Sequence, residues 1–123
     1  SLRFDAPVLG LYRTNTEEIS LHGVSIPERS KVMATYGAAN RDPNIFSNPD
    51  EFRLDRPQEE LRKHLSFGLG RHFCPGAQLS RMEAKLALEE VSRRFPNLRL
   101  VSNPQRIEPF LLWGRKELAV RWD

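Results

Sequence analysis

The sequence predicts an α+β fold made of short antiparallel β hairpins, an irregular meander, a cysteine-bearing loop and one long helix. Apolar residues recur at three- and four-residue steps from Leu79 to Phe95, which is the period of an amphipathic helix. Between residues 8 and 36 the apolar residues instead alternate in short runs separated by turn residues. Nine prolines and seven glycines in 123 residues indicate that loops fill much of the remaining chain.

The first 36 residues combine the end of a helix with a β region. Pro7 disfavours helix at the residue before it, so a helix in residues 1–5 ends by about Asp5. Within residues 6–36, an extended segment covers residues 8–14 and another strand covers residues 31–36. Between them, residues 19–27 alternate around the turn dipeptide His22-Gly23, which predicts a hairpin.

Residues 37–63 contain a short helix followed by the meander. The segment from Gly37 to Asp42 fits a helix that Pro43 stops. Pro49 and Pro57 then interrupt any regular structure, and the polar residues 58–63 lead into a loop at residues 64–76.

The last part of the chain combines the long helix, at residues 77–95, with a β tail at residues 96–123. Pro96 ends the helix, and we expect its apolar stripe to be ordinary core packing. In the tail, residues 98–101 form a strand, and residues 109–113 and 118–122 flank a turn at residues 114–117.

Composition excludes several classes of protein. The net charge of +3 comes from basic residues interspersed with acidic ones, so we expect no nucleic-acid partner. No run of eighteen apolar residues predicts a membrane segment, and the first residues are not a signal peptide. One cysteine excludes an internal disulfide and implies no oxidising compartment, so we expect a cytoplasmic location.

The loop of residues 67–76 carries the chain's only cysteine, Cys74. Glycines at Gly68, Gly70 and Gly76 let this backbone turn tightly and approach a flat ligand closely. A helix follows directly, and helix N-termini favour negative charge, so Cys74 is well placed to act as a thiolate. A thiolate is a soft metal ligand.

The pattern F-x-x-G-x-H-x-C-x-G in this loop resembles the haem-binding loop of the cytochrome P450 haem-thiolate monooxygenases. The matching residues are Phe67, Gly70, His72, Cys74 and Gly76. Residues 39–43 and 52–56 resemble the same family. The resemblance implies the C-terminal part of the P450 fold, of the bacterial-type soluble class.

The resemblance also implies a cofactor and its contacts. Cys74 would be the axial ligand of a haem b iron, and the catalytic residue of this chain. His72 and Arg13 would bind the haem propionates. The remaining cofactor-binding positions lie in the loop itself: Phe67, Gly68, Gly70 and Gly76.

Two arginines would belong to the structural charge network of the family. Arg3 corresponds to the arginine of a helical Glu-x-x-Arg pair, and Arg56 to the arginine of the meander. The glutamate would fall before Ser1, so we expect this chain to be the C-terminal portion of a longer P450 and to associate with the missing N-terminal part. Without that glutamate, the two arginines would be like charges lacking a counter-ion.

The implied activity is insertion of one oxygen atom from dioxygen into a hydrophobic small molecule. Electrons would arrive from a ferredoxin or flavoprotein, attracted by a basic face of Arg62, Lys63, Arg71 and Arg81. The expected substrate-lining residues are apolar and come from the two ends of the chain: Val8, Leu9, Leu11, Phe110, Leu111 and Leu112.

Two other interpretations stay open at this point. Cys74 could join His72, His64 and His22 in a zinc site, although the paired spacing of structural zinc sites is missing. Alternatively, the chain could be a non-catalytic truncated P450 without stable haem, because no counterpart of the family's oxygen-activating helix is present. Whether the chain is itself an enzyme therefore stays undecided by the sequence.

Overall fold

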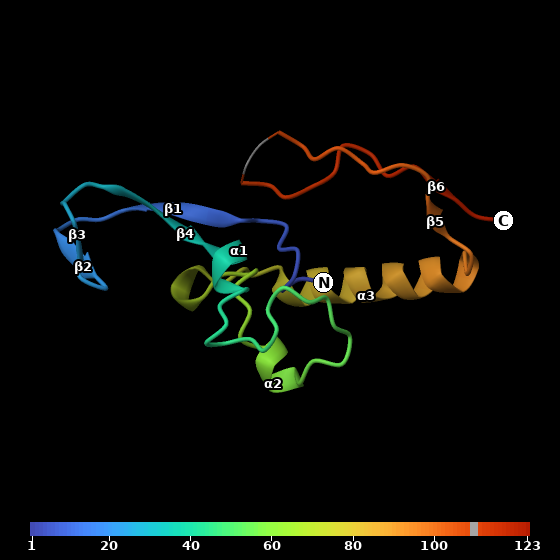
Figure 1. Ribbon diagram of the computed structural model, residues 1–123, viewed down its shortest axis with the longest axis horizontal. Helices are drawn as coiled ribbons and strands as arrows, with labels where there is room; N and C mark the ends of the chain where they lie inside the picture. The colour runs from blue at the N-terminus through green and yellow to red at the C-terminus, as the bar shows by residue number, and fades with distance from the viewer. Residues whose placement is uncertain (109–110) are drawn as a thin grey trace. The chain divides into compact units, whose positions relative to one another are not determined.

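The computed structural model describes residues 1–108 and 111–123 (Figure 1). These residues divide into two compact units. The first holds residues 1–66 together with 111–112, and the second holds residues 67–108 together with 113–123.

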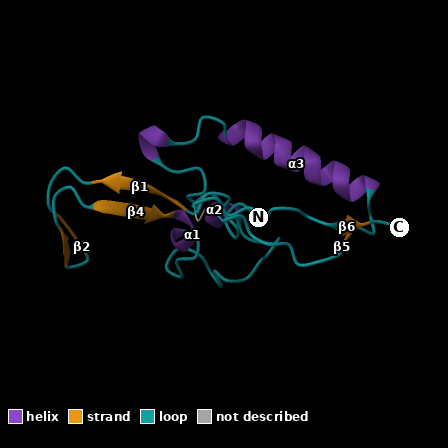
Figure 2. Ribbon diagram, turned by 90° about the horizontal axis from the view of Figure 1, so that it is seen from above, coloured by secondary structure: helices purple, strands orange, loops and turns teal. Residues whose placement is uncertain are grey.

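The first unit is built on two short antiparallel strand pairs. Strand β1 (Gly10–Thr14) lies beside β4 (Lys31–Thr35) (Figure 2). The two strands pair antiparallel, with Tyr12 opposite Met33. Strands β2 (Ile19–Leu21) and β3 (Val24–Ile26) form a hairpin. Its turn residues have φ values of 50° and 82°, the left-handed conformation that suits a two-residue hairpin. The predicted strands and hairpin are therefore present.

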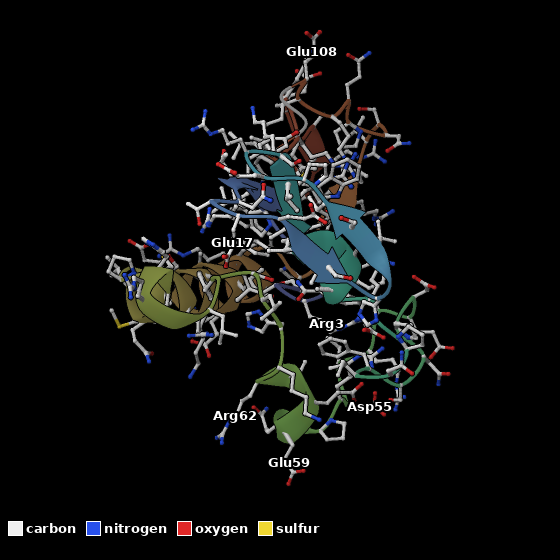
Figure 3. All side chains as sticks on the ribbon, turned by 90° about the vertical axis from the view of Figure 1, so that its left-hand side faces the viewer. Arg3, Glu17, Asp55, Glu59, Arg62 and Glu108 are labelled. Carbon is white, nitrogen blue, oxygen red and sulfur yellow. The ribbon has the colours of Figure 1, made fainter. Side chains whose placement is uncertain are left out.

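Two short helices follow β4. Helix α1 (Tyr36–Ala39) begins one residue before the predicted helix and ends before Pro43. Helix α2 (Gln58–Leu61) lies where the sequence indicated only a polar connection. Glu59 and Glu60 occupy its first turn, where acidic side chains favour a helix N-terminus. Figure 3 shows Glu59 and Arg62 pointing away from α2 into solvent.

The interior of the first unit is small and partly polar. Its buried apolar side chains are Ala6 and Phe46, the second of which is 1% exposed. Asn40, Arg3 and Arg56 are buried beside them. The expected helix end at residues 1–5 is a single turn, closed by a hydrogen bond from the Asp5 N–H to the Ser1 carbonyl at 2.9 Å.

The second unit begins with the cysteine loop. A 3₁₀ turn, η1 (Gly70–His72), lies inside this loop, and helix α3 (Ala77–Arg94) follows it for 18 residues (Figure 1). Strand β5 (Arg99–Leu100) then pairs antiparallel with β6 (Val120–Arg121). The Phe95 and Trp122 rings meet edge to face at 5.1 Å, which joins the end of α3 to β6.

The apolar stripe of α3 corrects the expectation of core packing. Leu79, Met82 and Leu86 are each more than half exposed, and Ala77 is the buried residue of the helix. The strands of the same unit are two residues long and largely exposed, so they offer little apolar surface for the stripe. An amphipathic period shows which face of a helix could be buried, and not whether this chain buries it.

The β tail differs from the predicted hairpin. The Ile107 N–H donates to the Gly114 carbonyl at 3.2 Å, and the Lys116 N–H donates to the Gln105 carbonyl at 3.0 Å. Residues 114–116 are therefore paired and do not form the predicted turn, while β6 pairs with β5. Gly114 suggested a turn, but a Cβ there would lie 3.1 Å from Ile107 Cδ1, so this glycine allows two segments to approach closely.

Candidate functional site

Backbone hydrogen bonds within the second unit fold the cysteine loop on itself. The Cys74 N–H donates to the Phe67 carbonyl at 2.9 Å, and the Phe73 N–H donates to the Gly70 carbonyl at 3.0 Å. Gly68 and Gly70 have φ values of 73° and 71°, a conformation that costs a residue with a side chain roughly 1–2 kcal/mol. These two glycines therefore serve the tight turns that the sequence predicted.

The Cys74 thiol is free and half-buried, at the start of α3. The Ala77 N–H donates to the Cys74 carbonyl at 3.2 Å, which joins the cysteine directly to the first turn of the helix. A Cβ at Gly76 would lie 3.8 Å from the sulfur, an ordinary van der Waals contact. Glycine at position 76 thus places no side-chain atom against the sulfur.

Two aromatic rings that precede the cysteine in the loop contact each other. The Phe67 and Phe73 rings meet edge to face with their centroids 6.5 Å apart. The Arg81 guanidinium lies over the Phe67 ring at 4.6 Å from its centroid, a cation–π contact. The sequence placed Arg81 on a basic surface, and its spacing gave no signal that it would stack on this ring.

The two residues predicted to bind propionates are both exposed. His72 lies in η1 of the second unit. Arg13 lies on β1 of the first unit, where its Nη1 donates to the neighbouring Tyr12 carbonyl at 2.8 Å. Because they belong to different units, their joint role stays a prediction.

The two arginines that the sequence assigned to a charge network are both buried in the first unit, and both donate mainly to carbonyl oxygens. Arg3 donates to the Asn40 and Pro49 carbonyls, each at 2.8 Å. Both Arg3 and Arg56 donate to the Glu51 carbonyl, at 3.1 and 3.0 Å. These carbonyls satisfy buried guanidinium N–H groups without supplying a negative charge.

Arg56 has a carboxylate partner that was not predicted from the sequence. Its Nη1 lies 2.9 Å from Glu60 Oε1, and the two side chains are 1% and 11% exposed. Burial acts to raise the pKa of Glu60, but the hydrogen bond from the Ser47 N–H and the charge of Arg56 together hold that pKa below its ordinary value. The i,i+4 spacing of the pair was the available signal.

Arg3 lies among other cations. Burial first, and then the charges of Arg56 and Arg41, lower the pKa of Arg3 from its ordinary value. Its guanidinium also lies 5.2 Å from the centre of the Phe46 ring. Arg41 is itself held by Asp50 at 2.8 Å and by the Phe4 carbonyl at 2.9 Å.

Two predicted substrate-lining segments meet, although about 100 positions separate them. The Leu9 N–H donates to the Leu111 carbonyl at 3.0 Å, and Val8 forms an isolated β-bridge with Leu112. Leu11 lies further along β1 and is 41% exposed. Phe110 lies outside the described residues.

The donor set around Cys74 does not fit a zinc ion. The described residues contain no group of three or more histidine, cysteine and acidic side chains that could hold a metal ion. This finding is against the zinc site of Cys74, His72, His64 and His22, because structural zinc needs four ligands. A single open thiol is what a haem iron requires as its axial ligand, since the porphyrin supplies the other donors. The residues present therefore fit a haem.

One buried residue near the entrance of the loop was not predicted from the sequence. The Asn40 side chain bonds to Leu65 and Ser66, which directly precede the loop. Nothing in the sequence signals this role, because Asn40 stands out only as part of residues 39–43, which resemble the family.

No helix of the described residues is long and apolar enough to cross a membrane.

Comparison with known proteins identifies a matching family. The cytochrome P450 family model matches residues 1–120. The biotin biosynthesis cytochrome P450 of Bacillus subtilis is 41% identical over 123 residues, which cover 99% of this chain and 30% of that protein. The steroid C26-monooxygenase of Mycolicibacterium smegmatis is 41% identical over 102 residues, which cover 83% of this chain and 25% of that protein.

Solved structures agree with these sequence relatives. P450BioI in complex with an acyl carrier protein ligated to hexadec-9Z-enoic acid matches 99% of this chain with a TM-score of 0.92 and 38% identity. CYP109E1 from Bacillus megaterium in complex with testosterone matches 99% of this chain with a TM-score of 0.91 and 35% identity. The chain covers 31% and 34% of these two structures, respectively. It therefore spans about a third of the proteins it resembles.

Proposed function

The chain belongs to the cytochrome P450 family, and from this premise we propose that it supplies the cysteine-ligand part of a haem-thiolate monooxygenase. Haem-thiolate monooxygenase chemistry is supported at the level of the family, which includes relatives named as monooxygenases. The observation that carries the proposal is the free, half-buried thiol of Cys74 in a folded glycine loop that leads into α3.

A haem bound at a thiolate supplies the iron at which dioxygen is activated, with electron donation from the sulfur that favours cleavage of the O–O bond. Cys74 would hold the haem iron through its sulfur. Phe67, whose ring contacts Phe73 edge to face, would exclude water from the sulfur, and Phe73 would stiffen the loop. N–H groups of the loop would tune the reduction potential. The turns at Gly68 and Gly70 hold this backbone in place.

We propose haem b as the cofactor, held at its propionates by His72 and Arg13. Both side chains are exposed and can therefore reach a carboxylate outside the protein interior. A guanidinium pairs with a carboxylate through two parallel hydrogen bonds, which makes Arg13 the stronger of the two anchors.

The substrate we propose is a hydrophobic small molecule. The segments of Val8 and Leu9 and of Leu111 and Leu112 meet in the first unit, and these residues together with Leu11 offer an apolar surface. Phe110 is included from the sequence pattern alone. Testosterone and a fatty acyl group on a carrier protein are named in the two similar structures, and both are largely apolar.

Electron delivery would come from a ferredoxin or flavoprotein attracted by basic side chains. Arg62 and Arg71 are exposed and suit this role. Arg81 is less available to an acidic partner than the sequence suggested, because its guanidinium already lies over the Phe67 ring. We place the reaction in the cytoplasm, since a ligand cysteine must remain a free thiol.

The family's oxygen-activating helix would come from the remainder of a longer P450, with which this chain would associate. The exposed apolar stripe of α3 supports such an association, because an apolar face of this extent is usually covered. The alternative is a non-catalytic truncated P450 without stable haem. The small interior of the first unit favours this alternative.

A single spectroscopic experiment separates the two functions. We expect the purified chain, mixed with haemin, reduced and exposed to carbon monoxide, to give the red-shifted Soret band of a thiolate-ligated haem. Cys74→Ala should lose this band, because it removes the ligand. Met82→Ala, which removes an exposed sulfur from α3, is the matched control and should keep the band.

Two outcomes would count against the proposal. If Cys74→Ala kept the band at the level of the Met82→Ala control, Cys74 would not be the ligand. If the folded wild-type chain gave no band at any haemin concentration, the non-catalytic alternative would be preferred.

A further inference from the structure

We propose that Asn40 is a positioning residue, whose buried side-chain amide holds the two residues that lead into the cysteine loop. This role rests on the proposed function only in so far as the loop presents Cys74 to a haem. The contacts themselves lie entirely in the first unit.

Both ends of the Asn40 amide are used. Its Oδ1 accepts the Leu65 N–H at 2.7 Å, and its Nδ2 donates to Ser66 Oγ at 2.9 Å. The Ser66 hydroxyl in turn donates to the Leu2 carbonyl at 2.6 Å. The Asn40 amide therefore holds both the main-chain N–H of Leu65 and the side chain of Ser66. These two contacts fix the direction of the chain at residues 65 and 66.

Asn40 is itself firmly held. Its side chain is fully buried, with an exposed fraction of 0%. Its N–H donates to the Tyr36 carbonyl at 2.9 Å, and its carbonyl accepts Arg3 Nη1 at 2.8 Å. In a buried network with every partner in place, each bond supports the others, and the loss of one leaves a polar group unpaired in the interior.

The chain transmits this anchoring to the cysteine over a short distance. Ser66 is joined by one peptide bond to Phe67, and the Phe67 carbonyl accepts the N–H of Cys74 at 2.9 Å. A change of backbone direction at Ser66 can act on Phe67 through the covalent chain alone, and Phe67 is the residue whose carbonyl accepts the Cys74 N–H. Asn40, which is far from Cys74 in sequence, thus restricts how the thiol is presented.

The single cysteine makes this role measurable without haem. A thiol reagent such as 5,5′-dithiobis(2-nitrobenzoate) reacts at Cys74 alone, so its rate in the full chain reports opening of this loop. We expect Asn40→Ala to increase that labelling rate by roughly tenfold, because it removes the two hydrogen bonds from the Asn40 side chain to Leu65 and Ser66. Asn40→Asp keeps an acceptor for the Leu65 N–H and should fall between Asn40→Ala and the wild type.

Controls separate positioning from general loss of stability. Asn44→Ala, an exposed asparagine in the same segment, should leave the labelling rate unchanged. Wild-type chain in enough urea to match the unfolding free energy of Asn40→Ala should label more slowly than that variant. Ser66→Ala removes the other partner of the amide. It should also increase the rate, and it decides the question if Asn40→Ala does not fold.

A second readout concerns the cofactor. In the haem-loaded chain, Asn40→Ala and Ser66→Ala should lower the fraction of haem with the thiolate-type carbon monoxide band, with less effect in Asn44→Ala. The proposal is overturned if Asn40→Ala and Ser66→Ala label no faster than the urea-matched wild type. If the wild-type chain gives no thiolate band, the proposed function fails, and the labelling result still decides the role of Asn40.

Discussion

Two buried arginines of the first unit determine its electrostatics. Arg3 and Arg56 both donate to the Glu51 carbonyl, at 3.1 and 3.0 Å. At this close range, the positive charge of Arg56 helps to lower the pKa of Arg3. Main-chain carbonyls accept from both side chains, and Glu60 supplies a carboxylate at 2.9 Å from Arg56. Glu60, together with Asp50 on Arg41, offsets a local excess of positive charge, so the chain should be sensitive to the protonation of Glu60.

We expect the free energy of unfolding to fall on acidification, with Glu60 contributing. Because the pKa of Glu60 is lowered in the folded chain, its stabilising contribution is present above the ordinary glutamate pKa of about 4.3 and is lost as the pH falls through the lower folded value. Urea unfolding at several pH values measures this dependence.

The matched variant for this prediction is Glu60→Gln, which cannot ionise. It should be less stable than the wild type at neutral pH and should show a weaker decline in acid, whereas Glu59→Gln on the exposed side of α2 should behave as the wild type. Parallel acid profiles for wild type and Glu60→Gln would show that the Arg56–Glu60 pair contributes nothing measurable.

Among the elements, helix α3 shows the clearest difference between pattern and environment. Its sequence has the period of a core helix, and yet Leu79, Met82 and Leu86 are exposed. Ion pairs of Glu90 with Arg93 and Arg94, at 2.7 and 2.9 Å, hold the exposed last turn. Exposed ion pairs of this kind contribute little each, so a partner that buried the stripe would stabilise the helix more than these pairs do.

Leu86→Ala should change the unfolding free energy of this chain by no more than about 0.5 kcal/mol, because Leu86 is 55% exposed. Phe46→Ala is the comparison, with an expected loss of about 3–5 kcal/mol, because Phe46 is 1% exposed. Urea titrations of both variants test the prediction. A loss of about 2 kcal/mol or more for Leu86→Ala would mean that the stripe is packed in the folded chain.

For the whole molecule, the division into two units falls between Ser66 and Phe67, at the entrance of the cysteine loop. The buried apolar side chains among the described residues are small in number and consist of Ala6, Phe46 and Ala77. Such an interior gives limited stability, so a ligand that binds the folded chain should stabilise it noticeably.

We expect haemin to raise the unfolding free energy of the wild-type chain, by about 2.7 kcal/mol when its free concentration is a hundred times the dissociation constant. Cys74→Ala should need far more haemin for the same shift, because it lacks the axial ligand. Thermal unfolding over a haemin series measures the effect. Equal shifts in both proteins would indicate binding that does not involve the thiol.

The sequence by itself determined the elements that depend on near neighbours. Alternation and the His22-Gly23 turn predicted the β2–β3 hairpin, and the three- and four-residue period predicted α3 to within a residue at its C-terminal end. The turns at Gly68 and Gly70 in the cysteine loop were also predictable, since their positive φ values follow from local turn chemistry. These features are encoded within a few residues of chain, and distant contacts change them little.

The tertiary structure decided what depends on distant residues. It paired β6 with β5, placed Glu60 against a buried arginine, joined Asn40 to Ser66 across 26 positions, and left the stripe of α3 exposed. Periodicity gives the faces of an element, whereas burial and hydrogen-bond partners depend on which other segments the chain brings to them. For that reason the cysteine loop was readable from sequence, and the network that holds its entrance was not.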